Sequence, residues 1–197
     1  MEYNFFATIS RMKYIDRWAL MRNSRNENLS EHSLEVAMIA HALCVIGNAR
    51  YERNLNADRA ALIGLYHDSS EIITGDMPTP VKYYNPEIKD AYKQVEKIAE
   101  YKLLEKLPAD LRPAFEEIYK STNSAEDKYM RRLVKAADKL SAYIKCIEEE
   151  KAGNTEFSTA KESVGKAIEK LRTELPEVDD FVKEFLPPYG KTLDELS

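Results

Sequence analysis

The sequence predicts an all-α protein that forms a single domain over residues 1–197. Three observations support this prediction: there are only six glycines, Ala, Leu, Glu and Lys recur at spacings of three and four, and few stretches alternate as strands do. A chain of this length buries a substantial core without disulfides or a structural metal. We therefore expect any bound metal ion to serve function rather than folding.

Composition disfavours several classes of protein. The formal net charge of -5 argues against binding to nucleic-acid polymers or anionic membranes. The longest apolar run, residues 36–47, contains His41 and is too short to span a bilayer, and no basic signal region opens the chain. Cys44 and Cys146 lie far from any CxxC or metal-binding spacing, which is typical of buried, reduced thiols. We expect a soluble, cytoplasmic protein.

The first elements are a helix and a basic segment. Residues 4–15 fit a short amphipathic helix, whereas residues 16–25 show no clear period. The surrounding stretch is locally basic, with Arg11, Lys13, Arg17, Arg22 and Arg25 against Asp16 alone. Guanidinium groups suit phosphate binding, and a solvated basic loop is the alternative.

Asn28, with a glutamate three residues later, predicts the N-cap of a helix that runs to about Asn48. Apolar residues occur nearly all round this helix, so we expect it to be central. His32 and His41 are nine residues apart and face opposite sides, so a straight helix cannot direct both to one ion. We take His32 as the candidate ligand and expect His41 in the core.

The next predicted helix, residues 57–73, begins at an Asn56 cap and carries a concentrated polar motif. His67 and Asp68 are adjacent, and Glu71 follows one turn later, so on a continuous helix the three side chains share a face. Gly64, one turn earlier, leaves room there for an ion or another helix. The motif predicts a metal site, and a partly exposed polar helix end is the alternative. The turn-rich segment 76–80 follows as either a substrate loop or a linker.

The remaining chain continues the helical pattern. We expect helices over 86–107, 109–120, 124–151, 155–174 and 176–185, with caps at Asn85 and Ser124. Asp138 lies on the flank of the core row of the helix 124–151. A carboxylate among small apolar neighbours needs a partner, because an unpaired buried charge is costly. Asp138 is therefore either a further ligand or an ordinary helix-edge aspartate.

His32, His67, Asp68 and Asp138 together offer two imidazoles and two carboxylates. This set suits Mn²⁺, Co²⁺, Fe²⁺ or Zn²⁺, and Mg²⁺ less well. The order H…HD…D resembles the HD-domain metal-dependent phosphohydrolases. The resemblance extends over essentially the whole chain: residues 10–13, 17–22, 31–37, 66–71, 74–83 and 135–138 are similar to those of the bacterial HD-domain 5'-deoxynucleotidases of the YfbR type.

This resemblance implies a single-domain HD helical fold and a homodimeric phosphoric monoester hydrolase. Its expected substrates are deoxyribonucleoside 5'-monophosphates, and its expected cofactor is one divalent metal ion per subunit, Co²⁺ or Mn²⁺. The implied metal ligands are His32, His67, Asp68 and Asp138. The implied catalytic residues are Glu71, for acid-base chemistry, and Arg17, which orients the phosphate. The implied substrate contacts are Arg17, Trp18, His32, Asp76, Met77, Pro78, Thr79 and Asp138. We expect Trp18 to exclude a 2'-hydroxyl.

Two alternatives come from different classes. The first is another HD phosphohydrolase, acting on a nucleoside triphosphate or a guanosine alarmone, although alarmone hydrolases carry an acidic pair after the HD motif and here Ile72 follows Glu71. Three histidines in all are too few for a histidine-rich site with two metals. The second alternative is a non-catalytic HD module that senses a ligand, which the intact ligand set with Glu71 argues against. Whether Glu71 or Asp76 protonates the leaving group stays open.

Overall fold

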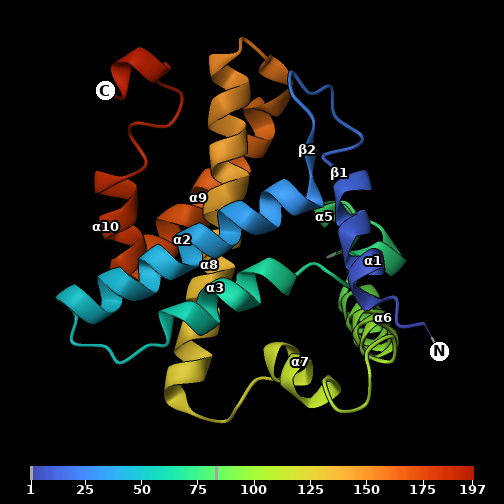
Figure 1. Cartoon of the computed structure of the whole chain (residues 1–197). Coiled ribbons are helices and arrows are strands. Elements are labelled where there is room, and N and C mark those ends of the chain that lie inside the picture. Colours follow the sequence, from blue (N-terminus) through green and yellow to red (C-terminus); the bar gives the residue numbers. More distant parts are fainter. Residues whose placement is uncertain (1, 83) are drawn as a thin grey trace.

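The computed structural model describes residues 2–82 and 84–197, apart from the side chains of Thr79 and Pro80. Three helices form its centre: α2 (Leu29–Arg50), α3 (Ala57–Tyr66) and α8 (Ala125–Lys151). Helix α3 packs along α2, and both cross α8 (Figure 1). Their facing apolar side chains make the main core, with additions from the C-terminal helices. The fold is therefore helical, as the sequence predicts.

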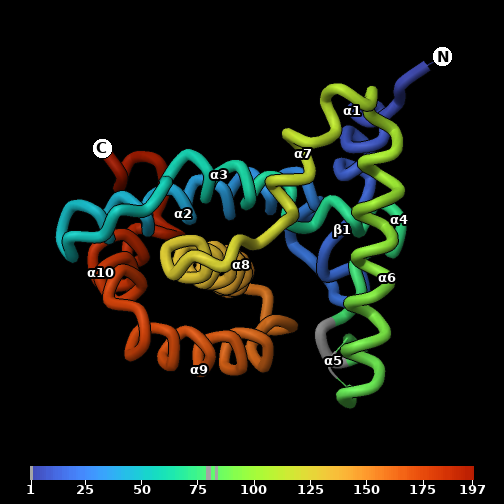
Figure 2. The backbone as a smooth tube through the Cα atoms, turned by 90° about the horizontal axis from the view of Figure 1, so that it is seen from below, coloured from blue at the N-terminus to red at the C-terminus, as the bar shows by residue number. Residues whose placement is uncertain are grey.

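Two groups of elements flank this centre on opposite sides (Figure 2). One group consists of α1 (Phe5–Ile9), the 3₁₀ turn η1 (Ser10–Tyr14), α6 (Pro86–Leu104) and α7 (Arg112–Tyr119). The other consists of η2 (Thr155–Phe157), α9 (Ser158–Glu174) and α10 (Pro176–Glu184), and η3 (Leu193–Glu195) follows near the C-terminus. The short helices α4 (Glu71–Thr74) and α5 (Thr79–Lys82) link α3 to α6. This arrangement leaves the N-terminal end of α2 facing the first group.

A small antiparallel pair, β1 (Asp16–Arg17) and β2 (Glu27–Asn28), is the only β structure within the described residues. It pairs Asp16 with Asn28 and Arg17 with Glu27. The sequence of this region shows no periodic pattern of apolar residues, because strands of two residues are too short to produce one. The pair closes the basic segment into a loop directly before α2 (Figure 1).

The helix caps predicted from sequence are confirmed. Asn28 accepts hydrogen bonds from the backbone of Ser30 and Glu31, and the Glu31 carboxylate accepts the Asn28 N–H at 3.2 Å. Asn56, Asn85 and Ser124 each cap their helices through a side-chain oxygen. These bonds satisfy backbone donors that the first turn of a helix leaves free. Local chemistry therefore sets where these helices begin.

The predicted continuous helix 57–73 is wrong, because α3 ends at Tyr66 and α4 begins at Glu71. A tight turn joins them, with Ser69 N donating to Tyr66 O at 3.0 Å and Glu71 N to Asp68 O at 2.9 Å. Bonds that span three residues instead of four tighten the backbone at the HD pair. The space over Gly64 holds another helix, since a Cβ there would lie 2.8 Å from the Ala37 Cα of α2.

The expectation that His41 lies in the core is also wrong. Its side chain is 48% exposed, beside the Asp58 carboxylate. It belongs to an outer row of α2 with Leu34, Met38 and Val45, all of them exposed. The helix is long and apolar enough to cross a membrane, but 56% of its apolar window is buried inside this fold. Helix α2 therefore carries apolar residues on every face, but its outer face is exposed.

Candidate metal centre

Three predicted ligands converge at the N-terminal end of α2 and the turn after α3. One ligand atom from each of His32, His67 and Asp68 lies within 4.8 Å of the other two. Asp68 Oδ2 lies 3.1 Å from His67 Nε2 and 3.6 Å from His32 Nε2. The His32 side chain is fully buried. Two imidazoles and a carboxylate at these separations can bind one small cation.

Asp138 reaches the same place from α8. Its Oδ1 lies 3.3 Å from His32 Nε2, and its Oδ2 accepts a hydrogen bond from Lys139 at 3.1 Å. It lies outside the tight group formed by the other three ligands. The structure thus brings all four predicted ligands together, from three segments that lie far apart in the chain. We refer to His32, His67, Asp68 and Asp138 as the metal centre.

Hydrogen bonds fix the tautomers of both imidazoles. His67 Nδ1 lies 2.7 Å from the Gly64 carbonyl, which only accepts, so Nδ1 carries the proton. His32 Nδ1 lies 3.0 Å from Ser141 Oγ, whose own hydroxyl donates to Glu35 Oε2 at 2.5 Å. Ser141 therefore accepts from His32. Each ring therefore directs Nε2, the nitrogen that would bind a metal ion, toward the centre. Against the effect of burial, the charges of Asp68 and Asp138 raise the pKa of His67 to about 9, so an arriving cation would displace the Nε2 proton of that ring.

Unpaired polar atoms also gather here. Across the described residues, seven buried side-chain nitrogen or oxygen atoms have no hydrogen-bond partner. Four of them, Arg17 Nε, His32 Nε2, His67 Nε2 and Glu71 Oε2, belong to this site. Buried polar groups are normally paired, so this concentration indicates a ligand. A divalent cation fits, because it would satisfy the two imidazole nitrogens and offset the repulsion between Asp68 and Asp138.

Glu71 is a buried carboxyl group with an unusual proton affinity. Burial, followed by the nearby charges of Asp68 and Asp76, raises its pKa to about 9. Burial likewise raises the pKa of Asp76, with Asp68 adding to the effect against the opposing influence of Arg17. In the metal-free site Glu71 is therefore protonated at pH 7, and a nearby divalent cation would lower its pKa toward neutrality, where a carboxyl group can take up and release a proton. Glu71 therefore has the chemistry of a general acid or base.

Arg17 and Trp18 close the site from the β1–β2 loop. The Arg17 guanidinium lies between two carboxylates, with NH1 3.5 Å from Asp68 Oδ2 and Nε 3.7 Å from Glu27 Oε2. Trp18 is half-buried against the edge of Phe157 and donates from Nε1 to Glu27 Oε2 at 3.1 Å. This places a cation and an aromatic ring beside the metal centre.

The loop after Gly75 supplies the other predicted substrate contacts. Met77 is half-buried and Pro78 is exposed. Asp76 lies close enough to Arg17 and Asp68 for their charges to change the pKa of the Asp76 carboxyl group. The side chain of Thr79 lies outside the part of the chain that the structure describes. Asp76 is thus the member of this loop whose charge is coupled to the centre.

A cavity of about 560 Å³ reaches the centre at His67 and Asp138. Its lining includes the cationic side chains Lys128, Arg131, Arg132 and Lys135, all on α8. Arg131 is paired with Asp127 and Arg132 with Glu174, so Lys128 and Lys135 are the lining cations left to attract an anion. Glu100 is the carboxylate that joins Asp138 in that lining. A positively charged wall attracts anionic ligands. The cavity therefore gives a phosphate compound a favourable route to the metal centre.

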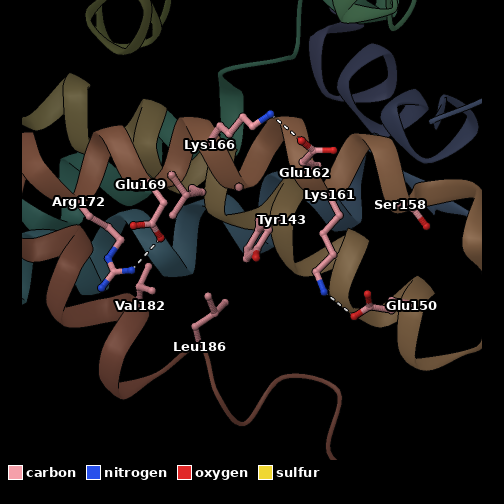
Figure 3. Close-up of a pocket in the computed structure, with 12 residues that line it drawn as sticks. Tyr143, Glu150, Ser158, Lys161, Glu162, Lys166, Glu169, Arg172, Val182 and Leu186 are labelled. Atoms are coloured by element: carbon pink, nitrogen blue, oxygen red, sulfur yellow. Dashed lines mark hydrogen bonds and ion pairs between the residues drawn. The ribbon is translucent and has the colours of Figure 1, made fainter.

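A larger hollow, about 770 Å³, lies between α8, α9 and α10 (Figure 3). Its cations are paired with neighbouring carboxylates: Lys161 with Glu150, Lys166 with Glu162 and Arg172 with Glu169. It contains no histidine, and none of its lining residues belongs to the metal centre. Paired charges leave little to recognise a phosphate, so we do not take this hollow as the active site.

Sequence reasoning missed three residues that support the centre. Ser141 lies one turn after Asp138, and Glu35 lies one turn after His32, so each shares a helix face with a predicted ligand. That spacing is a signal that could have identified them. Glu27 offers none, because its place opposite Arg17 depends on a β pair that the sequence does not reveal.

The helical fold and this donor set define a metal-dependent phosphohydrolase of the HD class. A family model described as 5'-deoxynucleotidase YfbR-like matches residues 4–189. A 5'-deoxynucleotidase from Erwinia tasmaniensis is 52% identical over 194 residues, which cover 98% of this chain and 96% of the relative. A relative of the same name from Photorhabdus temperata is 50% identical over the same shares. The chain belongs to the YfbR-like 5'-deoxynucleotidase family, as its motifs predict.

Solved structures agree on the fold. An HD-domain phosphohydrolase from Listeria innocua aligns with a TM-score of 0.78 at 25% identity, over 93% of this chain and 87% of the other. An HD phosphohydrolase of cyanophage S-2L aligns with a TM-score of 0.53 at 23% identity, over 75% of this chain and 73% of the other. That phage structure holds dA and one catalytic Zn²⁺ ion. The predicted HD fold is confirmed.

Proposed function

We propose that this chain hydrolyses deoxyribonucleoside 5'-monophosphates to deoxyribonucleosides and phosphate at the metal centre. The observation that carries this proposal is the group of buried atoms without a hydrogen-bond partner in Arg17, His32, His67 and Glu71, at a centre that a cavity reaches through His67 and Asp138. Family membership supplies the substrate class. The proposal places the whole reaction within a single domain, residues 1–197.

His32, His67, Asp68 and Asp138 would hold one divalent ion per subunit. The mixed set of two imidazoles and two carboxylates supports Co²⁺ or Mn²⁺. When bound, such an ion polarises the phosphate and makes water more acidic. The outer partners Gly64 and Ser141 accept from Nδ1 of the two rings and so direct both Nε2 atoms toward the ion.

Arg17 and Glu71 carry the remaining charge and proton steps. Arg17 would bind the phosphate and stabilise the negative charge that its oxygens develop in the transition state. Glu71 would accept the proton of the attacking water as the new P–O bond forms. The P–O5' bond then breaks, and the same proton returns to O5' to give the nucleoside hydroxyl. The bound cation would lower the pKa of Glu71 toward neutrality, which suits this exchange.

Trp18, Asp76, Met77, Pro78 and Thr79 would contact the nucleoside. We propose that the Trp18 ring packs against the sugar and leaves no room for a 2'-hydroxyl. Its half-buried position beside Arg17 supports this role. Trp18→Ala should therefore admit ribonucleotides. If ribonucleotides remain as poor as before relative to deoxyribonucleotides, the role assigned to Trp18 is wrong.

Homodimer formation is supported by the outer face of α2, where Leu34 is 54% and Met38 is 59% exposed. Leu62 and Leu65 of the neighbouring α3 are exposed as well. Light scattering of the purified chain tests this, and a monomer at micromolar concentration would contradict it. A cytoplasmic location is supported by the buried free thiols of Cys44 and Cys146.

Release of inorganic phosphate from a panel of nucleotides tests the activity. We expect turnover of deoxyribonucleoside monophosphates with Co²⁺ or Mn²⁺, and none with EDTA. Absence of metal-dependent turnover on every monophosphate would refute the proposal. Turnover restricted to triphosphates would instead favour a nucleoside triphosphate hydrolase.

A further inference from the structure

Glu27 is a buried carboxylate that touches three residues of the site. The residue is 8% exposed. Its Oε2 accepts the Trp18 Nε1–H at 3.1 Å and lies 3.7 Å from Arg17 Nε. Its Oε1 lies 3.5 Å from His32 Nδ1. One carboxylate thus connects the proposed sugar-contacting ring, the proposed phosphate-binding cation and a metal ligand.

We propose that Glu27 is a positioning residue that holds Trp18 and Arg17 in place and thereby sets the preference for deoxyribose over ribose. The inference rests on the proposed function, because it needs Trp18 to face the sugar. Glu27 itself acts through these two neighbours, and we assign it no contact with the substrate.

The Trp18 backbone shows why the indole needs an anchor. Its φ of 57° lies in the left-handed region, which a bulky residue adopts only when its surroundings enforce it. Two bonds hold the backbone, from Met21 N at 2.9 Å and from Asn23 Nδ2 at 3.2 Å to the Trp18 carbonyl. Neither bond orients the ring. The bond from Nε1 to Glu27, together with the Phe157 edge, does.

Arg17 depends on the same carboxylate. Arg17 and Glu27 are paired across β1 and β2, so the backbone brings the two side chains to one place. Glu27 attracts the guanidinium from one side and Asp68 attracts it from the other. Without the Glu27 charge, Arg17 would be drawn toward Asp68, a metal ligand, and away from a bound phosphate. Loss of Glu27 should therefore weaken nucleotide binding.

His32 depends less on Glu27, which separates this role from a general effect on the metal centre. Ser141 lies 3.0 Å from His32 Nδ1, closer than Glu27 at 3.5 Å. Ser141→Ala should therefore affect ion affinity more, and Glu27→Gln should affect sugar selectivity more. The two substitutions act on neighbours of the same nitrogen, His32 Nδ1, and make a matched pair.

The experiment compares Glu27→Gln with Ser141→Ala and with a control, Glu156→Gln. Glu156 binds Arg22 of the same loop at 2.6 Å, outside the metal centre, so its substitution tests general loosening of the loop. The first measurement is the ratio of kcat/KM for deoxyribonucleotides to that for the matching ribonucleotides. We expect Glu27→Gln to lower this ratio about 10-fold, because the uncharged amide holds the Trp18 Nε1–H and the Arg17 guanidinium more weakly than the carboxylate does. The ratio should stay at the wild-type value in both other variants.

The second measurement needs no turnover. Trp18 is the single tryptophan of the chain, so its fluorescence reports this site alone. We expect a red-shifted emission and stronger acrylamide quenching in metal-free Glu27→Gln and little change in Glu156→Gln, with thermal melts to verify that each variant is folded.

The outcomes separate the two proposals. An active wild type with unchanged selectivity and quenching in Glu27→Gln overturns the role of Glu27 and leaves the proposed function in place. A change in quenching without a change in selectivity overturns the specificity role. If the wild type hydrolyses no nucleotide while quenching still changes, the proposed function fails and the Glu27–Trp18 contact is supported.

Discussion

Gly64→Ala tests how closely α2 and α3 must approach for the metal centre to form. A Cβ on Gly64 would lie 2.8 Å from Ala37 Cα and 2.9 Å from Ala37 N. Both are backbone atoms, which cannot rotate away as a side chain can. The helices must therefore move apart by several tenths of an ångström. Overpacking of this kind lowers the free energy of unfolding by about 3 kcal/mol at the upper end. The higher helix propensity of alanine offsets about 1 kcal/mol of that loss.

The expected net loss is about 2 kcal/mol, or about 4–8 °C in Tm for a domain of this size. Metal affinity should fall too, because His32 lies on α2 while His67 directly follows α3. Thermal melts without metal and titrations with Mn²⁺ measure the two effects.

Gly165→Ala is the matched control within α9. Its new Cβ would meet only the Tyr143 ring, at 3.4 Å, which is ordinary contact. This variant should melt at or slightly above the wild-type temperature. If Gly64→Ala is as stable as Gly165→Ala and binds Mn²⁺ as the wild type does, the close approach of α2 and α3 is not what positions the centre.

Three further predictions concern charge. Because the folded-state pKa of Glu71 is raised from 4.5 to about 9, the metal-free wild type loses stability as pH rises from 4.5 toward 9. In urea melts, the free energy of unfolding of metal-free Glu71→Gln should therefore exceed that of the wild type by about 2–3 kcal/mol at pH 7 and by little at pH 4.5. Its turnover should fall about 100-fold or more. A stability difference that does not change with pH would refute this. Asp138→Ala should weaken Mn²⁺ binding at least about 10-fold in competition with a chelator, and equal affinity would remove Asp138 from the ligand set. Lys135→Glu should raise the KM for nucleotides and flatten the salt dependence of kcat/KM, whereas Lys170→Glu on the opposite flank should change neither.

Local chemistry explains which parts of the fold could be predicted. A cap depends on a few neighbouring atoms, so Asn28, Asn56 and Ser124 mark helix starts that the structure confirms. The four candidate ligands could be picked out because imidazole and carboxylate groups are conspicuous on otherwise apolar helix faces, and the structure brings their side chains together. The match to a known family then gave these residues their predicted roles.

Non-local contacts explain the misses. Whether the outer face of α2 is buried depends on which helices pack against it, and none of the described elements covers His41. The break between α3 and α4 cannot be read from helix period alone, because His67 and Ser70, at the two ends of the tightened turn, both keep helical backbone angles. Glu27 meets Arg17 only through a chain reversal that leaves no periodic pattern.

The bond between His32 and Ser141 joins residues 109 positions apart. During synthesis, His32 leaves the ribosome long before the helix that fixes its tautomer exists. Helices α2 and α3 can form and pack earlier, because their contacts are close in sequence. Competence to bind the ion must therefore arise late, when α8 docks across them. A nascent chain or a truncated product that lacks α8 would present His32 without Ser141, the partner that orients it, and without Asp138, and would stay inert until that helix arrives.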